Sequence, residues 1–205
     1  MLDVLMELLE NLIVAEEPVK TILISFVLTI ISCVSVIIIG AAVEKLEIFE
    51  MKFLSKLTSP KKALFIEDRL TFPGTILHEC AHAVTAWATG AKVTKIKFLT
   101  FFDAHKLGCV YFQPRGNMLQ QRFQLSLTSC APVLVGISAL NLLIYINAAI
   151  AMPWYFRVLS VYLMISIFNH MTMSTADIKN YLRGLISVFP VVFLIFYAIR
   201  LFNYR

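Results

Sequence analysis

Residues 71–90, TFPGTILHECAHAVTAWATG, contain the side chains of this chain that are best placed to do chemistry. His78 and His82 are four residues apart, so in a helix they lie on one face, where two imidazoles can bind a single zinc ion. Glu79 is not a ligand in this HExxH pattern, but it can reach a water on the metal as a general base. The segment has no other charged residue. We therefore predict a zinc site here.

The alternative for this segment is an ordinary soluble helix with two hydrogen-bonded histidines and a solvated glutamate. The neighbours of the acid argue against it, because Ile76, Leu77, Ala81 and Ala83 surround Glu79 with apolar side chains. A carboxylate in such surroundings is costly without a partner, and this favours the zinc interpretation.

A catalytic zinc site needs three protein ligands and a water, so one ligand lies outside the motif. No glutamate follows His82, which excludes the HExxH enzymes that use a downstream glutamate. Thr85 and Ala88 occupy the positions at which the extended metzincin pattern needs glycine and histidine. The remaining candidates are Asp103, His105, Cys109, Cys130, His170 and Asp177.

Asp177 is the favoured third ligand and His170 is the second choice. Asp177 stands at the end of a hydrophobic stretch, where an unpaired carboxylate is expensive. Two alternatives stay open. Residues 174–177 (STAD) also fit a capping arrangement at the start of the next helix, and the histidine could simply hydrogen-bond a neighbouring helix. Asp103 and His105 fall in a predicted turn, where a solvated face is the more ordinary interpretation.

The composition is typical of a polytopic membrane protein, because apolar residues make up 59% of the chain and charged residues 15%. The net charge of +5 is ordinary for such a protein and indicates no nucleic-acid partner. The four cysteines form no CxxC pair, so neither a disulfide framework nor a zinc knuckle is predicted. We expect the lipid bilayer as a partner. The predicted fold class is all-α, with about five transmembrane or re-entrant helices and a small interfacial β-hairpin.

The chain is predicted to divide into an amphipathic N-terminal segment at 1–20, a first transmembrane helix at 21–43, an interfacial connector at 44–70 and a membrane core at 71–205. The first segment is acidic where a secretory signal peptide would be basic, so we expect no cleavage. The helix at 21–43 has no charged residue and is long enough to cross a hydrocarbon core of about 30 Å. Pro60 is expected to end the helical pattern of the connector.

Residues 92–112 contain two runs rich in β-branched and aromatic residues around a polar turn, which predicts the β-hairpin. Three further spans are expected at about 126–151, 158–175 and 185–202, the last interrupted by Pro190. The first of these has a face of small residues for close helix packing, made by Ala131, Pro132, Gly136, Ser138 and Ala139.

These residues together resemble the site-2 proteases, a family of intramembrane zinc metalloproteases. The HExxH motif is followed by Gly90 and then by a basic, strand-forming stretch. Residues 129–132 (SCAP) are similar to the family's Ala-Gly-Pro helix start, and residues 169–177 to its Asn…Asp segment. The similarity covers roughly residues 70–185. The family's two prolines before the aspartate and its Gly-Gly after it are missing.

The resemblance implies an endopeptidase that hydrolyses a peptide bond in or near a transmembrane segment of another membrane protein. It implies Zn²⁺ held by His78, His82 and Asp177, with Glu79 as the catalytic base and Asn169 as a substrate-binding residue. It also implies a multi-pass protein of the plasma membrane with its active site towards the cytosolic side. The positive-inside rule does not decide this orientation, because Lys and Arg then divide equally between the two sides.

The alternative function is a membrane zinc carrier or a catalytically inactive protease-like scaffold, because intramembrane histidines and aspartates also mark ion pathways. Glu79 favours the enzyme, since a carrier does not need a non-ligating acid between two ligand histidines. The sequence indicates neither the identity of the substrate nor the oligomeric state.

Overall fold

The computed structural model describes residues 17–60, 62–63, 69–98 and 108–203. Along this part of the chain the elements are α2 (Glu17–Leu57), α4 (Phe72–Ala88), β1 (Lys92–Lys97), β2 (Cys109–Gln113), α5 (Met118–Ala149), α6 (Trp154–His170) and α7 (Thr175–Asn203). Helices dominate, and the two strands form one antiparallel sheet, so the predicted helical class with a small hairpin is confirmed. The amphipathic helix expected near the N-terminus lies outside the described residues.

Three helices are long and apolar enough to cross a membrane, over Val19–Leu57, Met118–Ala149 and Thr175–Phe202. Helices α4 and α6 have 17 residues each. This is about 25 Å of helix, which is shorter than a hydrocarbon core of about 30 Å. The protein thus has the character of a multi-pass membrane protein. The described residues contain three helices of spanning length, where about five transmembrane or re-entrant helices were predicted.

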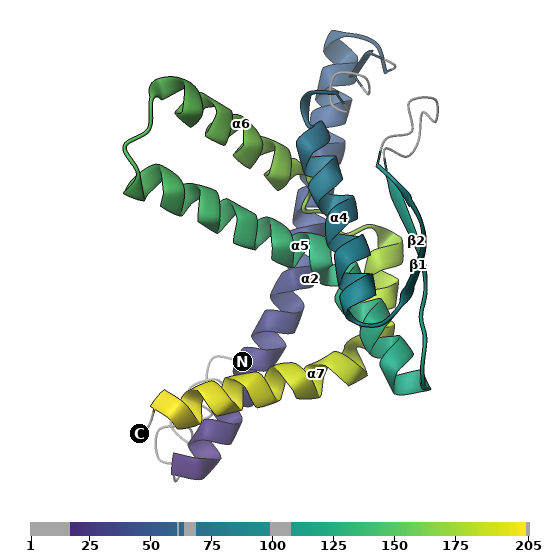
Figure 1. Cartoon of the computed structure of the whole chain (residues 1–205), viewed down its shortest axis with the longest axis vertical. Coiled ribbons are helices and arrows are strands. Elements are labelled where there is room, and N and C mark those ends of the chain that lie inside the picture. The colour runs from purple at the N-terminus through teal and green to yellow at the C-terminus, as the bar shows by residue number, and fades with distance from the viewer. Residues whose placement is uncertain (1–16, 61, 64–68, 99–107, 204–205) are drawn as a thin grey trace, which may run out of the picture.

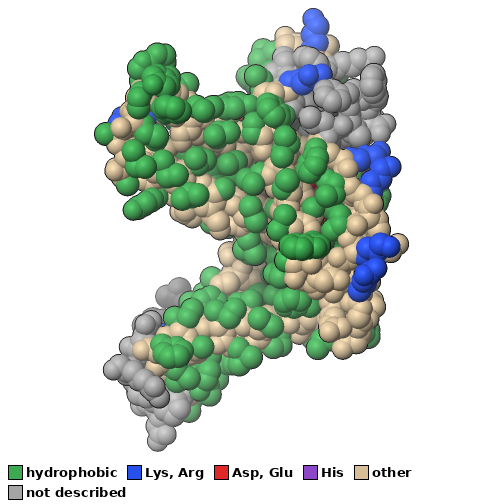
Figure 2. Space-filling view, viewed as in Figure 1, with side chains coloured by type: hydrophobic (Ala, Val, Ile, Leu, Met, Phe, Trp, Pro, Cys, Tyr) green, Lys and Arg blue, Asp and Glu red, His purple; other side chains and the backbone are tan. Residues whose placement is uncertain are grey.

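Many large hydrophobic side chains face outwards in this protein, and most of the buried side chains are small or polar. Phe26, Ile31 and Leu194 are exposed, whereas Ser25, Thr29 and other hydroxyl residues are buried. In Figure 2, hydrophobic side chains cover the arm formed by α5 and α6 and the arm that contains α7. Lys and Arg gather along the edge where the hairpin lies. A lipid environment favours this distribution, because close helix packing there relies on small and hydroxyl-bearing residues.

Helix α2 is longer than the sequence indicated. One helix of 41 residues, from Glu17 to Leu57, contains the predicted span at 21–43 and the first part of the connector predicted at 44–70. No helix-breaking residue occurs in 44–57, so the charged residues there extend the helix without a break. The helix ends shortly before Pro60, as expected, since a proline disfavours helical geometry in the residue before it.

Helix α4 is bounded by two recognisable signals. Pro73 lies in the first turn, where its missing N–H costs nothing. Gly90 follows the last turn with φ +89°, a conformation that glycine adopts freely. The N–H of Ala91 donates to Ala86 O at 2.8 Å and that of Gly90 to Trp87 O at 3.0 Å, which together form a Schellman motif. The helix packs against α5, α6 and the sheet (Figure 1).

The hairpin and the start of α5 hold the C-terminal end of α4 in place. Strands β1 and β2 pair antiparallel from Lys92↔Gln113 to Lys97↔Cys109, as the sequence predicted. Helix α5 then begins with a capping box between Asn117 and Gln120. The buried Gln124 joins these parts, because its Nε2 donates to Thr89 O at 3.0 Å and to Arg115 O at 3.1 Å. Its Oε1 accepts from Arg115 N at 2.8 Å.

The predicted small-residue face of α5 is only partly a packing face. Ala131, Pro132 and Gly136 are buried, and Gly136 lies against Met171. Ser138 is exposed and its hydroxyl donates to Leu134 O within the same helix. Pro190 lies inside α7 and does not end it, so the interruption predicted there is absent.

Candidate metal centre

The two histidines of the HExxH motif approach each other on one face of α4. Their Nε2 atoms are 3.1 Å apart and their ring centroids are 4.8 Å apart. Two nitrogens bound to one tetrahedral zinc at about 2.0–2.1 Å are separated by roughly 3.3 Å. The pair therefore has nearly the spacing that a shared zinc ion requires.

Each histidine is oriented by a backbone carbonyl from a neighbouring helix. His78 Nδ1 lies 2.6 Å from the carbonyl O of His170 at the end of α6. His82 Nδ1 lies 2.8 Å from the carbonyl O of Thr128 in α5. A carbonyl oxygen only accepts, so both Nδ1 atoms carry a proton and donate it. Metal-binding histidines are commonly oriented in this way, because donation from one ring nitrogen leaves the other free for the metal.

The result is that two acceptor atoms face each other. In a neutral imidazole with its proton on Nδ1, Nε2 presents a lone pair. The lone pairs of His78 and His82 meet at 3.1 Å, and only an added proton or a cation between them satisfies both. The chemistry of the pair therefore fits a zinc ion. The hydroxyl of Thr128, next to the acceptor of His82, is buried and has no hydrogen-bond partner in the described part of the chain.

Glu79 lies against Gly108, the residue before β2. Its side chain is 7% exposed, and none of the residues described donates a hydrogen bond to its carboxylate. Gly108 passes so close that a Cβ there would lie 2.5 Å from Glu79 Cγ and 2.6 Å from Oε1. A buried carboxylate without a donor is costly to keep. Its place beside the histidine pair suits a group that accepts a proton during a reaction.

Asp177, the predicted third ligand, forms the alternative capping arrangement. It lies in the first turn of α7, and its Oδ2 accepts from Ser174 Oγ at 2.5 Å and from Ser174 N at 3.2 Å. The N–H of Asp177 donates to Ser174 Oγ at 3.2 Å, which completes a reciprocal cap. Both bonds to the carboxylate use Oδ2, so they leave Oδ1 free.

His170 contributes to the site through its backbone. Its ring Nε2 lies 2.8 Å from Thr71 Oγ1 and 3.3 Å from Thr75 Oγ1, on the first turns of α4. The ring is thus engaged in the helix–helix bond that the sequence left open as an alternative, while the carbonyl of the same residue orients His78.

Asn169, the predicted substrate-binding residue, bonds to a different helix. Its Nδ2 donates to Glu50 Oε2 on α2 at 3.0 Å. The neighbouring His170 is bonded to α4, so these two residues connect the end of α6 to two different helices.

The other predicted ligand candidates add no third group. Cys130 is buried and its Sγ lies 3.4 Å from Leu127 O, within its own helix. Cys109 is half-buried at the start of β2. Asp103 and His105 lie outside the described residues. Within the described residues, no three His, Cys, Asp or Glu side chains gather in a group able to hold a metal ion.

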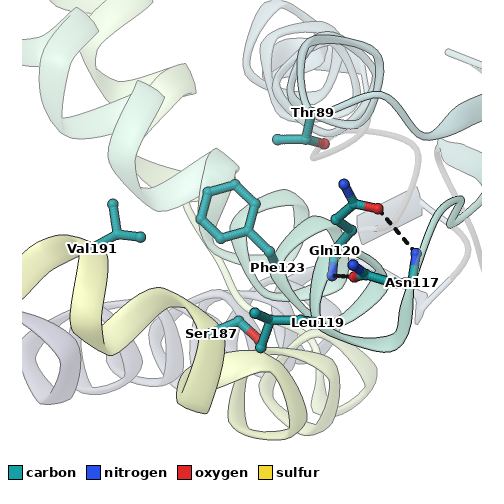
Figure 3. A pocket seen from close by; sticks show the side chains of 7 residues that line it. All are labelled: Thr89, Asn117, Leu119, Gln120, Phe123, Ser187 and Val191. Carbon is teal, nitrogen blue, oxygen red and sulfur yellow. Dashed lines mark hydrogen bonds between the residues drawn. The ribbon is translucent and has the colours of Figure 1, made fainter.

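A cavity of about 390 Å³ lies at the C-terminal end of α4, beside the cap residue Thr89. Figure 3 shows Phe123 and Leu119 of α5 lining it together with Ser187 and Val191 of α7. The Ser187 hydroxyl is buried and has no hydrogen-bond partner in the part of the chain that the structure describes. None of the HExxH residues lines this cavity, so the candidate metal chemistry is located elsewhere.

Comparison of this chain with protein-family models, with curated proteins and with solved structures found no match in any of the three. The case for the site therefore rests on its own residues and geometry.

Sequence reasoning identified the histidines and the acid but missed the groups that orient them. The carbonyls of Thr128 and His170 are 46 and 92 residues away from the histidines that they accept from. A backbone carbonyl carries no side-chain signature. Two signals were nevertheless present, because Pro132 lies four residues after Thr128 and His170 lies at the end of an apolar run.

Proposed function

We propose that this protein is a zinc-dependent membrane endopeptidase that hydrolyses a peptide bond in or near a transmembrane segment of another membrane protein. The observation that carries the proposal is the pair of Nε2 atoms at 3.1 Å beside a buried carboxylate to which none of the described residues donates a hydrogen bond. A zinc carrier needs the histidine pair only. Hydrolysis needs the pair and the acid together.

The zinc ion would be held by His78 and His82, and Asp177 would have to move towards this pair to serve as the third ligand, because the three side chains do not form a metal-holding group in the structure. The capping bonds of Asp177 use Oδ2, so Oδ1 remains available to a metal. Bound zinc supplies Lewis-acid polarisation of a peptide carbonyl and acidifies a water.

Glu79 is the proton carrier of the proposed reaction. It accepts the proton of the attacking water and returns it to the leaving amine. Gly108, the residue before β2, lies against the carboxylate, which reduces its contact with bulk water. A reacting water that enters the site therefore meets a carboxylate to which none of the described residues donates a hydrogen bond.

The substrate must present an extended backbone to such a site. A transmembrane helix hides its peptide groups in its own hydrogen bonds, so it has to unwind locally before cleavage. The sheet has two strands only, so β1 and β2 each have an outer edge that is unpaired within the described residues. An unwound substrate segment can join such an edge as an added strand. Asn169 would bind this segment only after releasing Glu50.

Cleavage by the purified protein in liposomes tests the proposal. Single-span membrane proteins are the probes, and zinc is removed with a chelator and then restored. Cleavage should stop and return with zinc. Glu79→Gln should bind zinc as the unmodified protein does, yet its cleavage rate should fall about 10²- to 10⁴-fold, because that is the usual contribution of a general base.

Glu44→Gln is the matched control, because Glu44 is a half-buried acid on α2, outside the HExxH motif. It should leave both zinc content and cleavage unchanged. Normal cleavage by zinc-loaded Glu79→Gln would show that the general-base assignment is wrong. Zinc movement across the liposome membrane without cleavage of any probe would instead support the carrier.

A further inference from the structure

The carbonyl that orients His82 is available because of a proline. In an α-helix, each carbonyl accepts from the N–H of the residue four positions later. For Thr128 that residue is Pro132, which has no N–H. The helix continues on both sides of Pro132, so the free carbonyl lies in the middle of α5 and not at its end. His82 Nδ1 fills the vacant place at 2.8 Å.

Burial gives this carbonyl few other partners. Thr128 is 1% exposed and Pro132 is also buried, so bulk water does not reach the vacant position. An unpaired buried carbonyl costs free energy comparable to a lost hydrogen bond. The His82 ring satisfies this carbonyl only when it turns Nδ1 towards α5, and this rotation directs Nε2 towards His78.

We propose that Pro132 is a positioning residue of the metal centre: by lacking an N–H, it reserves the Thr128 carbonyl for His82 and holds His82 Nε2 ready for a metal. The proposal rests on the proposed zinc site, but it makes a separate claim about the tautomer of His82. The other histidine follows the same principle, since the carbonyl of His170 lies in the last turn of α6, where carbonyls have no intrahelical partner.

The usual role of a proline inside a helix is to bend it. The two roles differ in what they require. A bend depends on the pyrrolidine ring, whereas reserving the carbonyl depends only on the missing N–H. A pair of variants with the same side chain but different backbone atoms at position 132 separates them.

Pro132→Ala restores an N–H that competes with His82 for Thr128 O. Pro132→lactic acid introduces the ester analogue of alanine, with the same methyl group and an oxygen in place of the N–H. Zinc affinity is measured by competition with a metal indicator. Pro132→Ala should bind zinc about 10- to 100-fold more weakly, which is the usual effect of losing an orienting partner of a metal ligand. Pro132→lactic acid should retain the affinity of the unmodified protein.

Pro190→Ala is a second control, because it removes the other helix-interior proline, in α7, and should leave zinc affinity unchanged. Equal affinity of Pro132→Ala and the unmodified protein would overturn the proposal. Equally weak binding by Pro132→Ala and Pro132→lactic acid would also overturn it, because the ring and not the missing N–H would then be responsible.

Nitrogen-15 NMR of the zinc-free protein tests the tautomer without any metal. The chain has four histidines, and His82 is assigned by the signal that disappears in His82→Gln. His82 should carry its proton on Nδ1 in the unmodified protein and in Pro132→lactic acid, and should become a mixture of tautomers in Pro132→Ala. An unchanged tautomer in Pro132→Ala overturns the proposal. If the unmodified protein binds no zinc, the proposed function fails, but this measurement still decides the role of Pro132.

Discussion

Helices α4 and α6 are alike in length and lie against each other, yet their buried polar residues differ in hydrogen bonding. Both have 17 residues. All buried residues of α6 are polar, namely Ser160, Ser166 and His170, and each of them has a hydrogen-bond partner. Helix α4 buries mostly small residues and one acid, Glu79, to which no described residue donates a hydrogen bond.

The buried polar residues of α6 contribute to helix packing, whereas Glu79 of α4 is the candidate for chemistry. Ser166 Oγ accepts from Gly74 N at 2.8 Å and donates to Thr71 O at 2.8 Å, so it connects α6 to the first turn of α4. Such satisfied groups stabilise a buried interface. A buried carboxylate with no donor among the described residues is instead costly, and groups of this kind cluster at functional sites. We therefore expect changes on α6 to lower stability and changes at Glu79 to lower activity.

The largest expected effect is loss of zinc, and it also identifies the third ligand. His82→Ala leaves too few ligands for a catalytic site, so zinc per mole of purified protein should fall to background. Asp177→Ala should lower the zinc content as much as His82→Ala does. His170→Ala should keep its zinc, because the group that orients His78 is the backbone carbonyl, which alanine retains.

Metal analysis of the three variants decides between ligand and cap. If Asp177 only caps α7, its replacement should cost about 1 kcal/mol of stability and leave zinc in place. Full zinc in Asp177→Ala together with loss in His170→Ala would reverse the assignment of the two residues.

Gly74→Ala should have the largest effect on stability. A Cβ at Gly74 would lie 1.9 Å from the backbone O of Ser166, so α4 and α6 would have to separate. Overpacking of this kind typically costs about 1–3 kcal/mol, and a clash with backbone belongs at the upper end. Gly40→Ala is the milder comparison, since its Cβ would first meet a side chain and not backbone, at 2.6 Å from Cγ of the buried Met173. In detergent, the unfolding temperature of Gly74→Ala should be well below that of Gly40→Ala. Equal unfolding temperatures would contradict the close contact between α4 and α6.

Ser166→Ala should have a smaller effect of the same kind. It removes two hydrogen bonds between α6 and the N-terminal end of α4, from Gly74 N and to Thr71 O, and the net value of each is about 0.5–1.5 kcal/mol. Gly74 N–H keeps its second acceptor, Thr71 O, at 3.0 Å. Ser160→Ala on the same helix is the control, because it removes only the bond from Asn147, which also donates to Leu143 O. Both variants should still bind zinc. A loss of zinc in Ser166→Ala alone would mean that the α4–α6 contact belongs to the metal centre itself.

The sequence predicted the elements whose signals are local. The runs of β-branched and aromatic residues within 92–112 predicted the hairpin, and Pro60 predicted where the first long helix ends. The four-residue spacing of His78 and His82 predicted their meeting, because it depends on helix geometry alone.

The features that the sequence left open depend on contacts between distant segments. Helix α2 runs to Leu57 because nothing in 44–57 breaks it, although its charges suggested an interface. The hydrogen bonds of Asn169 and His170 cross to α2 and α4, and no periodicity reveals such partners. The cap at Asp177 and a ligand at Asp177 use the same residue types, so the pattern alone could not separate them.

The smallest expected effect is that of Glu79→Gln on stability. None of the described residues donates to the Glu79 carboxylate, and a neutral amide of nearly the same shape is cheaper to bury than this charge. Zinc-free Glu79→Gln should therefore unfold at the same temperature as the unmodified protein or slightly above it, in contrast to Ser166→Ala. A loss of stability larger than about 1 kcal/mol, which is the net value of an ordinary hydrogen bond, would mean that Glu79 has a structural partner. Unchanged stability together with lost cleavage would place this residue among those that proteins retain for activity at the expense of stability.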